Sequence, residues 1–312
     1  MLSRMVALHP DRTGTVHSGE TGDVRVQWYE VGPEDPAAIT VVYVHGFNIS
    51  AEEFCFQVGA LRGRGVRQVL VDLRGHGQSG ECEPTKLNVD DAADDIAVVL
   101  HARGVRGPIV VVGHSLGGPV SLSLMRRYAA DFNWAGTVQI SSAVEPFAMQ
   151  GMPQLLAGPV GRALAWVVSH TPRFAEGMRR AVTATLAPVL ALGFYFRPMD
   201  YAIIQFHARM IQQTPLATYA GFFDDLLVHS ESGAGAVLAG LPGYILVGDR
   251  DHVTPVSQSA QLARLWPRAS VQILPDSGHM PPLDAPGAVT AAIERVVNGI
   301  CTPPKGAKRS RT

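Results

Sequence analysis

Cysteine is scarce in this chain: only three of its 312 residues are cysteines, at positions 55, 82 and 301. The number is odd and the spacing is irregular, so the sequence predicts neither a disulfide framework nor a site with metal-ligand spacing. Such cysteine usage is typical of a reducing compartment. Because residues 1–14 also contain no apolar run of signal-peptide length, we expect the protein to be cytoplasmic.

An excess of charge of either sign is lacking too. The formal net charge is −1, so the protein has no broad electrostatic field that would attract nucleic acid. The exception is local, because residues 301–312 carry four basic side chains and are predicted to form a disordered tail. A solvated terminus is the simplest interpretation of this tail, and a weak tether to an anionic surface is the alternative.

Long hydrophobic runs are absent as well. The longest uncharged stretches, residues 146–161 and 181–196, have 16 residues each, and both contain proline. A transmembrane helix needs about 20 mostly apolar residues, so we expect no membrane span. The 46 % share of hydrophobic residues instead indicates a globular chain with a sizeable core.

Short apolar runs do occur, and they alternate with helical patterns. Strands are predicted at residues 24–29, 39–44, 68–73, 108–112, 137–140, 244–247 and 271–274. Helices are predicted at residues 90–100, 119–128 and 286–298. Continuous apolar strands with helices between them predict an α/β fold, in which a mostly parallel sheet is covered by helices on both faces.

This alternation is interrupted between residues 144 and 239. The segment is rich in Leu, Ala, Met, Phe and Pro and contains no β-branched run of strand type. The sequence therefore predicts an α/β core made of residues 1–143 and 240–300, with residues 144–239 inserted as a helical segment.

The strongest chemical signal is the G-x-S-x-G pattern Gly113-His114-Ser115-Leu116-Gly117. It follows a predicted strand and precedes a predicted helix, so Ser115 is expected at the tip of a sharp strand-to-helix turn. Small residues two positions before and after the serine let the strand and the helix approach closely. A glycine-rich turn of a nucleotide-binding domain is the alternative, but no G-x-G-x-x-G pattern is present.

A serine nucleophile needs a base, and His279 is the candidate. It is one of 11 histidines, but it alone lies in the last loop after a predicted strand, flanked by Gly278 and Pro281. His114 adjoins the serine on a different face of the turn, and we interpret it as structural.

The acid that orients this base should lie between the serine and the histidine, after an intervening strand. Asp249 and Asp251 both follow the predicted strand at residues 244–247. Spacing alone does not choose between them.

An oxyanion hole needs two donors aimed at the developing negative charge. The backbone N–H of Leu116, directly after the serine, is one candidate. The backbone N–H of Phe47 is the other, because it follows the strand predicted at residues 39–44 and Gly46 permits a close backbone approach.

Taken together, these motifs resemble the α/β-hydrolase superfamily over nearly the whole chain apart from the insertion and the two ends. The matching segments are H-G-F at residues 45–47, D-L-R-G-H-G-Q-S at 72–79, G-H-S-L-G-G at 113–118, G-D-R-D-H-V-T-P at 248–255 and S-G-H-M-P-P-L-D-A-P at 277–286.

The resemblance implies three further assignments. The acid of the family lies in a G-x-x-D-x-x-x-P pattern that aligns with Gly248, Asp251 and Pro255, which favours Asp251 over Asp249. The insertion of residues 144–239 corresponds to a lid, or cap domain. The segment at residues 72–79 corresponds to a structural turn, to which we assign no chemistry.

These residues predict a serine hydrolase, without metal or cofactor, that cleaves an ester or related acyl bond of a small-molecule substrate through an acyl-enzyme. The apolar composition of residues 154–196 favours an apolar acyl group, although packing between lid and core is the alternative. Lactone or C–C bond hydrolysis, perhydrolysis of the cofactor-free haloperoxidase type and acyl transfer would use the same triad. Dehalogenase and epoxide-hydrolase chemistry is disfavoured because those relatives use aspartate where Ser115 stands. A non-catalytic binding protein on this fold is the remote alternative.

Overall fold

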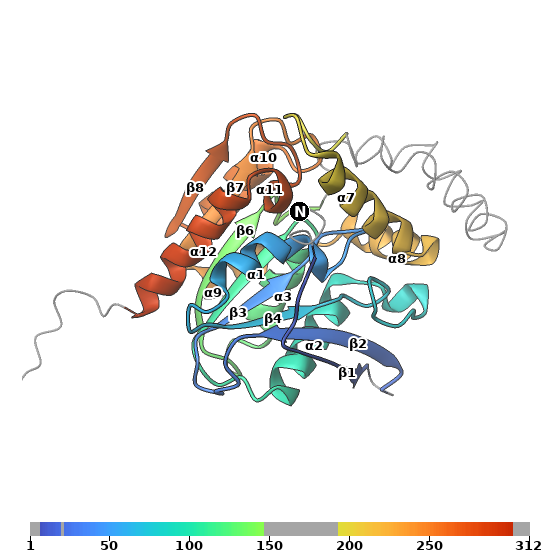
Figure 1. Ribbon diagram of the computed structural model, residues 1–312, viewed down its shortest axis with the longest axis vertical. Coiled ribbons are helices and arrows are strands. Elements are labelled where there is room, and N and C mark those ends of the chain that lie inside the picture. Colours follow the sequence, from blue (N-terminus) through green and yellow to red (C-terminus); the bar gives the residue numbers. More distant parts are fainter. Residues whose placement is uncertain (1–6, 20–21, 147–192, 302–312) are drawn as a thin grey trace, which may run out of the picture.

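The structure is a computed structural model, and it describes residues 7–19, 22–146 and 193–301. Its centre is one sheet of eight strands among the described residues, in the order β1-β2-β4-β3-β5-β6-β7-β8 (Figure 1). The pairs β1–β2 and β2–β4 are antiparallel, and every other pair is parallel. The strands are β1 (Arg12–Ser18), β2 (Val24–Val31), β3 (Thr40–Val44), β4 (Arg67–Val71), β5 (Ile109–His114), β6 (Trp134–Ile140), β7 (Gly243–Gly248) and β8 (Ala269–Leu274).

Helices follow most of these strands. The α-helices described are α1 (Cys55–Leu61), α2 (Val89–Ala102), α3 (Gly117–Arg127), α7 (Tyr201–Gln213), α8 (Leu216–Leu226), α9 (Gly235–Leu238), α10 (Val256–Leu265), α11 (Pro281–Asp284) and α12 (Pro286–Cys301). Short 3-10 helices are η2 (Ala51–Phe54), η3 (Pro84–Lys86) and η5 (Ser232–Ala234). No helix in these described ranges is long and apolar enough to span a membrane.

The core lies on both faces of the sheet, as β3 illustrates. Successive side chains of a strand point to opposite faces. Val42 and Val44 pack in the cluster that contains side chains of α2, α3 and α10. Val41 and Tyr43 pack in the cluster that contains side chains of α1 and α12. All four are fully buried, so the prediction of a mostly parallel sheet covered on both faces is confirmed.

Strand β1 was not predicted from the sequence. Its residues alternate between partly buried and exposed positions and end in a buried serine, so it contains no apolar run. Antiparallel pairing with β2, from Arg12 opposite Glu30 to Ser18 opposite Val24, holds it at the edge of the sheet. Backbone pairing rather than side-chain burial therefore defines this strand.

Only part of the predicted insertion, residues 144–239, can be compared with the structure. Residues 147–192, with most of the uncharged stretches noted above, lie outside the described residues, as does the basic tail from residue 302. The described residues 193–239 contain α7, α8 and α9 and no strand. Ile203 and Phe206 of α7 share an apolar cluster with Ile49, Met280 and Leu283, which belong to the core. That the whole insertion forms a lid stays a prediction.

Candidate active site

Ser115 lies between the end of β5 and the start of α3, with a backbone φ of 51°. This left-handed conformation is strained for a residue with a side chain. Its N–H donates to the carbonyl of Ile140, 3.0 Å away, which fixes the turn against β6. A Cβ atom at Gly113 would lie 2.5 Å from the carbonyl oxygen of Gly117, and one at Gly117 would overlap the carbonyl oxygen of Val44. The close approach expected at these two glycines is present.

The side chains of Ser115 and His279 meet at hydrogen-bond distance. Oγ of Ser115 lies 2.9 Å from Nε2 of His279. On the other side of the ring, Nδ1 lies 3.0 Å and 2.9 Å from the two carboxylate oxygens of Asp251. All three residues are buried, with exposed fractions of 5 %, 6 % and 4 % for Ser115, His279 and Asp251. The structure thus brings together three residues that are far apart in the sequence.

Asp251 is held as an ionised carboxylate. Burial alone would raise the pKa of this carboxyl, but His279 and the N–H of Thr254 lower it to about 2. The N–H groups of Val253 and Thr254 each donate to Oδ1 over 2.9 Å. Asp249, by contrast, is exposed, and its N–H donates to the carbonyl of Leu274. Asp251, and not Asp249, is therefore the carboxylate in contact with His279.

Phe47 and Leu116 contribute the two backbone N–H groups predicted for an oxyanion hole. Within the described ranges, neither N–H has a hydrogen-bond acceptor. Leu116 immediately precedes α3, so its N–H is one of the free donors at a helix N-terminus. Both groups are therefore candidates for the donors of an oxyanion hole.

His45 sets the direction of the Phe47 N–H. Its Nε2 accepts from the N–H of Leu73 over 2.9 Å, so Nδ1 carries the proton and donates to the carbonyl of Gly46 over 2.8 Å. Burial lowers the pKa of His45 to about 4, which keeps the ring neutral. In a trans peptide the C=O and the following N–H point in opposite directions, so fixing the carbonyl of Gly46 also fixes the N–H of Phe47.

His76 holds the next residue of the same loop. Nδ1 of His76 donates to the carbonyl of Arg74 over 3.0 Å, and Nε2 accepts from the N–H of Asn48 over 3.3 Å. Burial lowers the pKa of His76 to about 3, so this ring is neutral as well. The segment at residues 72–79, to which the sequence assigned no chemistry, thus positions the loop that presents Phe47.

Asp284 holds the loop that carries His279, and sequence reasoning missed it. Its carboxylate accepts from Oγ of Ser277 over 2.7 Å and from the N–H of Gly278 over 3.0 Å. Burial raises the pKa of this carboxyl. The N–H of His279 donates to the carbonyl of Phe194 over 3.1 Å. This ties the loop to the first described residues after the 147–192 segment.

An aromatic stack adjoins the predicted oxyanion loop. The ring of Phe47 stacks on Tyr219 of α8, with centroids 5.1 Å apart, and Tyr219 stacks on Phe223 at 5.7 Å. Oγ1 of Thr218 donates to the carbonyl of Gly75 over 3.0 Å, which ties α8 to the turn after β4. Figure 1 shows α7 and α8 together at one end of the sheet. Helix α8 therefore brings the ring of Tyr219 next to Phe47.

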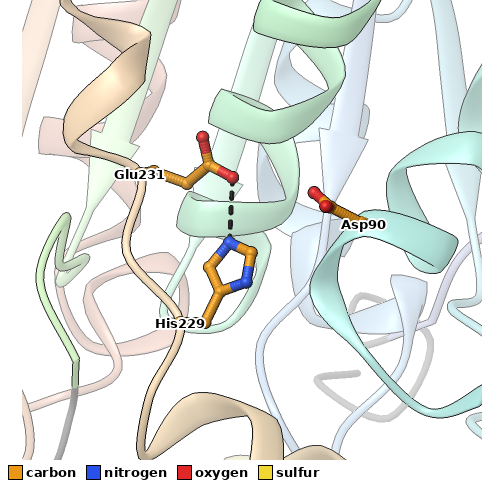
Figure 2. A group of neighbouring side chains, drawn as sticks. All are labelled: Asp90, His229 and Glu231. Carbon is orange, nitrogen blue, oxygen red and sulfur yellow. Dashed lines mark hydrogen bonds and ion pairs between the residues drawn. The ribbon is translucent and has the colours of Figure 1, made fainter.

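A second group of polar side chains has the composition of a metal site. Figure 2 shows Asp90, His229 and Glu231 turned toward one another, with His229 Nε2 2.8 Å from Oε1 of Glu231. No motif in the sequence pointed to this grouping. However, Arg126 donates from Nε and Nη2 to the two carboxylate oxygens of Glu231, over 2.9 Å and 3.1 Å. A cation bound to Glu231 would lie next to the positively charged guanidinium of Arg126, and the two charges would repel each other. The group is therefore better described as an ion-pair network.

Comparisons with known proteins bear on the family and the fold of the chain. The profile of the alpha/beta hydrolase family matches residues 41–293. The chain is 25 % identical over 265 residues to the magnesium-chelatase 30 kDa subunit of Rhodobacter capsulatus, covering 82 % of this chain and 85 % of that protein. It is 27 % identical over 251 residues to a non-heme haloperoxidase of Rhodococcus erythropolis, covering 77 % of this chain and 85 % of that protein.

Solved structures share the fold. A thermophilic esterase from Thermogutta terrifontis, solved with malate bound, superposes with a TM-score of 0.73 at 23 % identity. The alignment covers 93 % of this chain and all of that one. At this level of identity, the likeness extends to the architecture alone.

Proposed function

The chain belongs to the alpha/beta hydrolase family, and on this premise we propose that it is a serine hydrolase that cleaves an ester or related acyl bond of a small, apolar substrate. The observation that carries the proposal is the 2.9 Å contact between Oγ of Ser115 and Nε2 of His279, with Asp251 on the opposite ring nitrogen. A buried serine next to a carboxylate-oriented imidazole is the arrangement that activates a hydroxyl as a nucleophile.

In the first half of the reaction, Oγ of Ser115 attacks the substrate carbonyl carbon while Nε2 of His279 takes the hydroxyl proton. The carbonyl oxygen becomes negatively charged and accepts from the N–H groups of Phe47 and Leu116. Removal of one such donor costs about 10²–10³ in kcat in other hydrolases. The tetrahedral adduct then collapses, and the leaving alcohol departs with the proton from His279. An acyl group remains on Ser115.

In the second half, His279 takes a proton from water, which attacks the acyl carbon. Collapse of the second adduct releases the acid, and the proton returns to Ser115. The ionised Asp251, whose pKa is about 2, keeps the proton of His279 on Nδ1 and stabilises the imidazolium that forms in each half. Ser115 is thus the nucleophile, His279 the base and then the acid, and Asp251 the group that orients His279.

An acceptor other than water is a second candidate. The likeness to a non-heme haloperoxidase favours a perhydrolase, in which peroxide would attack the acyl-enzyme in place of water. Lactone or C–C bond hydrolysis and acyl transfer use the same residues and stay predictions. We place this chemistry in the cytoplasm, which the three free thiols at Cys55, Cys82 and Cys301 support.

Labelling with a serine-directed phosphonate tests the proposal. The wild-type protein should be labelled at Ser115 and should hydrolyse p-nitrophenyl butyrate. Ser115→Ala should do neither while keeping the melting temperature of the wild type. Near-wild-type turnover in Ser115→Ala would refute the mechanism. Peroxide added to the assay should increase acyl release only if the perhydrolase candidate is correct.

A further inference from the structure

Two charged groups outside the proposed triad lie buried beside it. Glu53, in η2, is 0 % exposed, and so is His114, the last residue of β5. Oε2 of Glu53 lies 2.7 Å from Nδ1 of His114. Among the described residues neither atom has a hydrogen-bond partner, so the contact between them is electrostatic. The two groups therefore form a buried ion pair.

The other ends of this pair contact the two loops that the proposed chemistry depends on. Oε1 of Glu53 accepts from the N–H of Gly46 over 2.9 Å. Nε2 of His114 lies 2.8 Å from the carbonyl oxygen of His279 and donates to it. One chain of contacts thus runs from the residue before Phe47 to the backbone of His279.

The charge on His114 follows from its surroundings. Nε2 donates to the carbonyl of His279, and the Glu53 carboxylate lies 2.7 Å from Nδ1, where it stabilises a positive charge on the ring. Burial alone would lower the pKa of His114, but Glu53 and the carbonyl of His279 more than offset this and raise it. These surroundings therefore favour the protonated, positively charged form of His114.

Stability alone does not account for such a pair. Replacing a buried ion pair by apolar side chains of similar volume is often neutral or stabilising, because desolvation of the charges offsets their attraction. The pair is also tightly packed, because a Cβ atom at Gly46 would lie only 2.9 Å from Nδ1 of His114. A role in geometry explains the pair better.

We propose that Glu53 and His114 are positioning residues that hold the N–H of Phe47 and the ring of His279 in register with Ser115. The inference rests on the proposed function, because it assigns those two groups to the reaction. A misplacement of reacting groups by about 1 Å can cost about 10²-fold in rate. Loss of the contact between Glu53 and His114 should therefore lower mainly kcat.

Two variants test the pair from its two ends. Glu53→Gln keeps the size of the side chain and removes its charge. His114→Asn keeps a donor near Glu53 but is too short to reach the carbonyl of His279. Glu52→Gln is the matched control, because Glu52 is the neighbouring acid and pairs with Arg209 at the surface. Active sites are counted by titration with the phosphonate, and kcat is expressed per titrated site.

We expect kcat per titrated site to fall about 10- to 100-fold in Glu53→Gln and His114→Asn, with KM within about twofold of wild type. The control should keep the wild-type kcat. A merely structural role would lower the titrated fraction and leave kcat per site unchanged, and that result in both variants would overturn the proposal. If one variant does not fold, the other decides. A wild-type protein that is neither labelled nor active would count against the proposed function instead.

Discussion

Both carboxylate oxygens of Asp251 lie within 3.0 Å of Nδ1 of His279. The nearby Asp249 is exposed at the end of β7 and makes no such contact. Two aspartates that spacing could not rank are therefore in very different environments. Substituting each aspartate in turn tests which of the two takes part in the reaction.

Asp251→Asn should reduce kcat/KM far more than Asp249→Asn. An amide at position 251 can donate to Nδ1 and so favours the wrong tautomer of His279, a change that costs about 10⁴ in rate in a serine protease with the same kind of triad. Asp249→Asn should stay within about threefold of wild type, because exposed substitutions away from a site have small effects. Steady-state kinetics on p-nitrophenyl butyrate measures both, and a larger loss in Asp249→Asn would contradict the assignment.

Acid titration should weaken the contribution of Asp251 to stability. Its pKa is lowered from 3.8 to about 2 in the folded protein, so the ionised carboxylate stabilises the fold above about pH 4, and this stabilisation is lost as the pH falls toward about 2. The difference in unfolding free energy between wild type and Asp251→Asn, measured in urea, should shrink between about pH 5 and about pH 3. A difference that grows as the pH falls over this range would show that the pKa of Asp251 is not lowered in the folded protein.

Gly46→Ala should reduce turnover, because the added methyl group would lie 2.9 Å from Nδ1 of His114 and 3.1 Å from Ile49. We expect kcat to fall at least about 10-fold. Gly59→Ala is the control. A Cβ atom at Gly59, within α1, meets nothing within 4 Å, so this change should keep activity and raise stability by about 0.5–1 kcal/mol. Equal activity in the two variants would argue against a tight fit at Gly46.

Longer apolar acyl chains should be better substrates. The prediction comes from the apolar composition of residues 154–196, most of which lie outside the described residues, and from the Phe47–Tyr219 stack. Each buried methylene contributes about 0.8 kcal/mol, so kcat/KM should rise roughly 10²-fold from acetyl to hexanoyl esters if the chain is desolvated in the transition state. A flat profile, or a preference for charged acyl groups, would speak against an apolar pocket.

Chelation should leave activity unchanged. The group of Asp90, His229 and Glu231 has the spacing of a metal site, but Arg126 donates to both carboxylate oxygens of Glu231. The rate of ester hydrolysis is therefore expected to be the same after dialysis against EDTA. Loss of activity that a divalent metal restores would assign a metal role to this group.

Much of the fold could be predicted because most strands are buried on both faces. Such strands consist of apolar runs, and β3, β5 and β7 differ from their predicted bounds by only one or two residues. Strand β1 could not be predicted, because its side chains are largely exposed and its partner β2 defines it through backbone pairing.

Some residues of the candidate site could likewise be predicted from the sequence, and others could not. Ser115 could be identified because its local sequence must build a sharp turn, and the glycines of that turn are visible in the sequence. The contacts that position the site are not local. His114 and the carbonyl it contacts are 165 positions apart, and in the sequence Glu53 and Asp284 resemble any surface acid. Only the folded chain shows that both are buried.

The hydrogen bond from the N–H of His279 to the carbonyl of Phe194 has a practical consequence for protein engineering. A side chain at Gly278 would overlap that same carbonyl, so the stretch of chain at residue 194 and the histidine loop fit each other closely. A chimaera that grafts the inserted segment of another hydrolase onto this core should therefore place its downstream junction before Phe194. Donor sequence that replaced this stretch would bring a foreign backbone against the histidine, and the graft would then alter turnover as well as substrate choice.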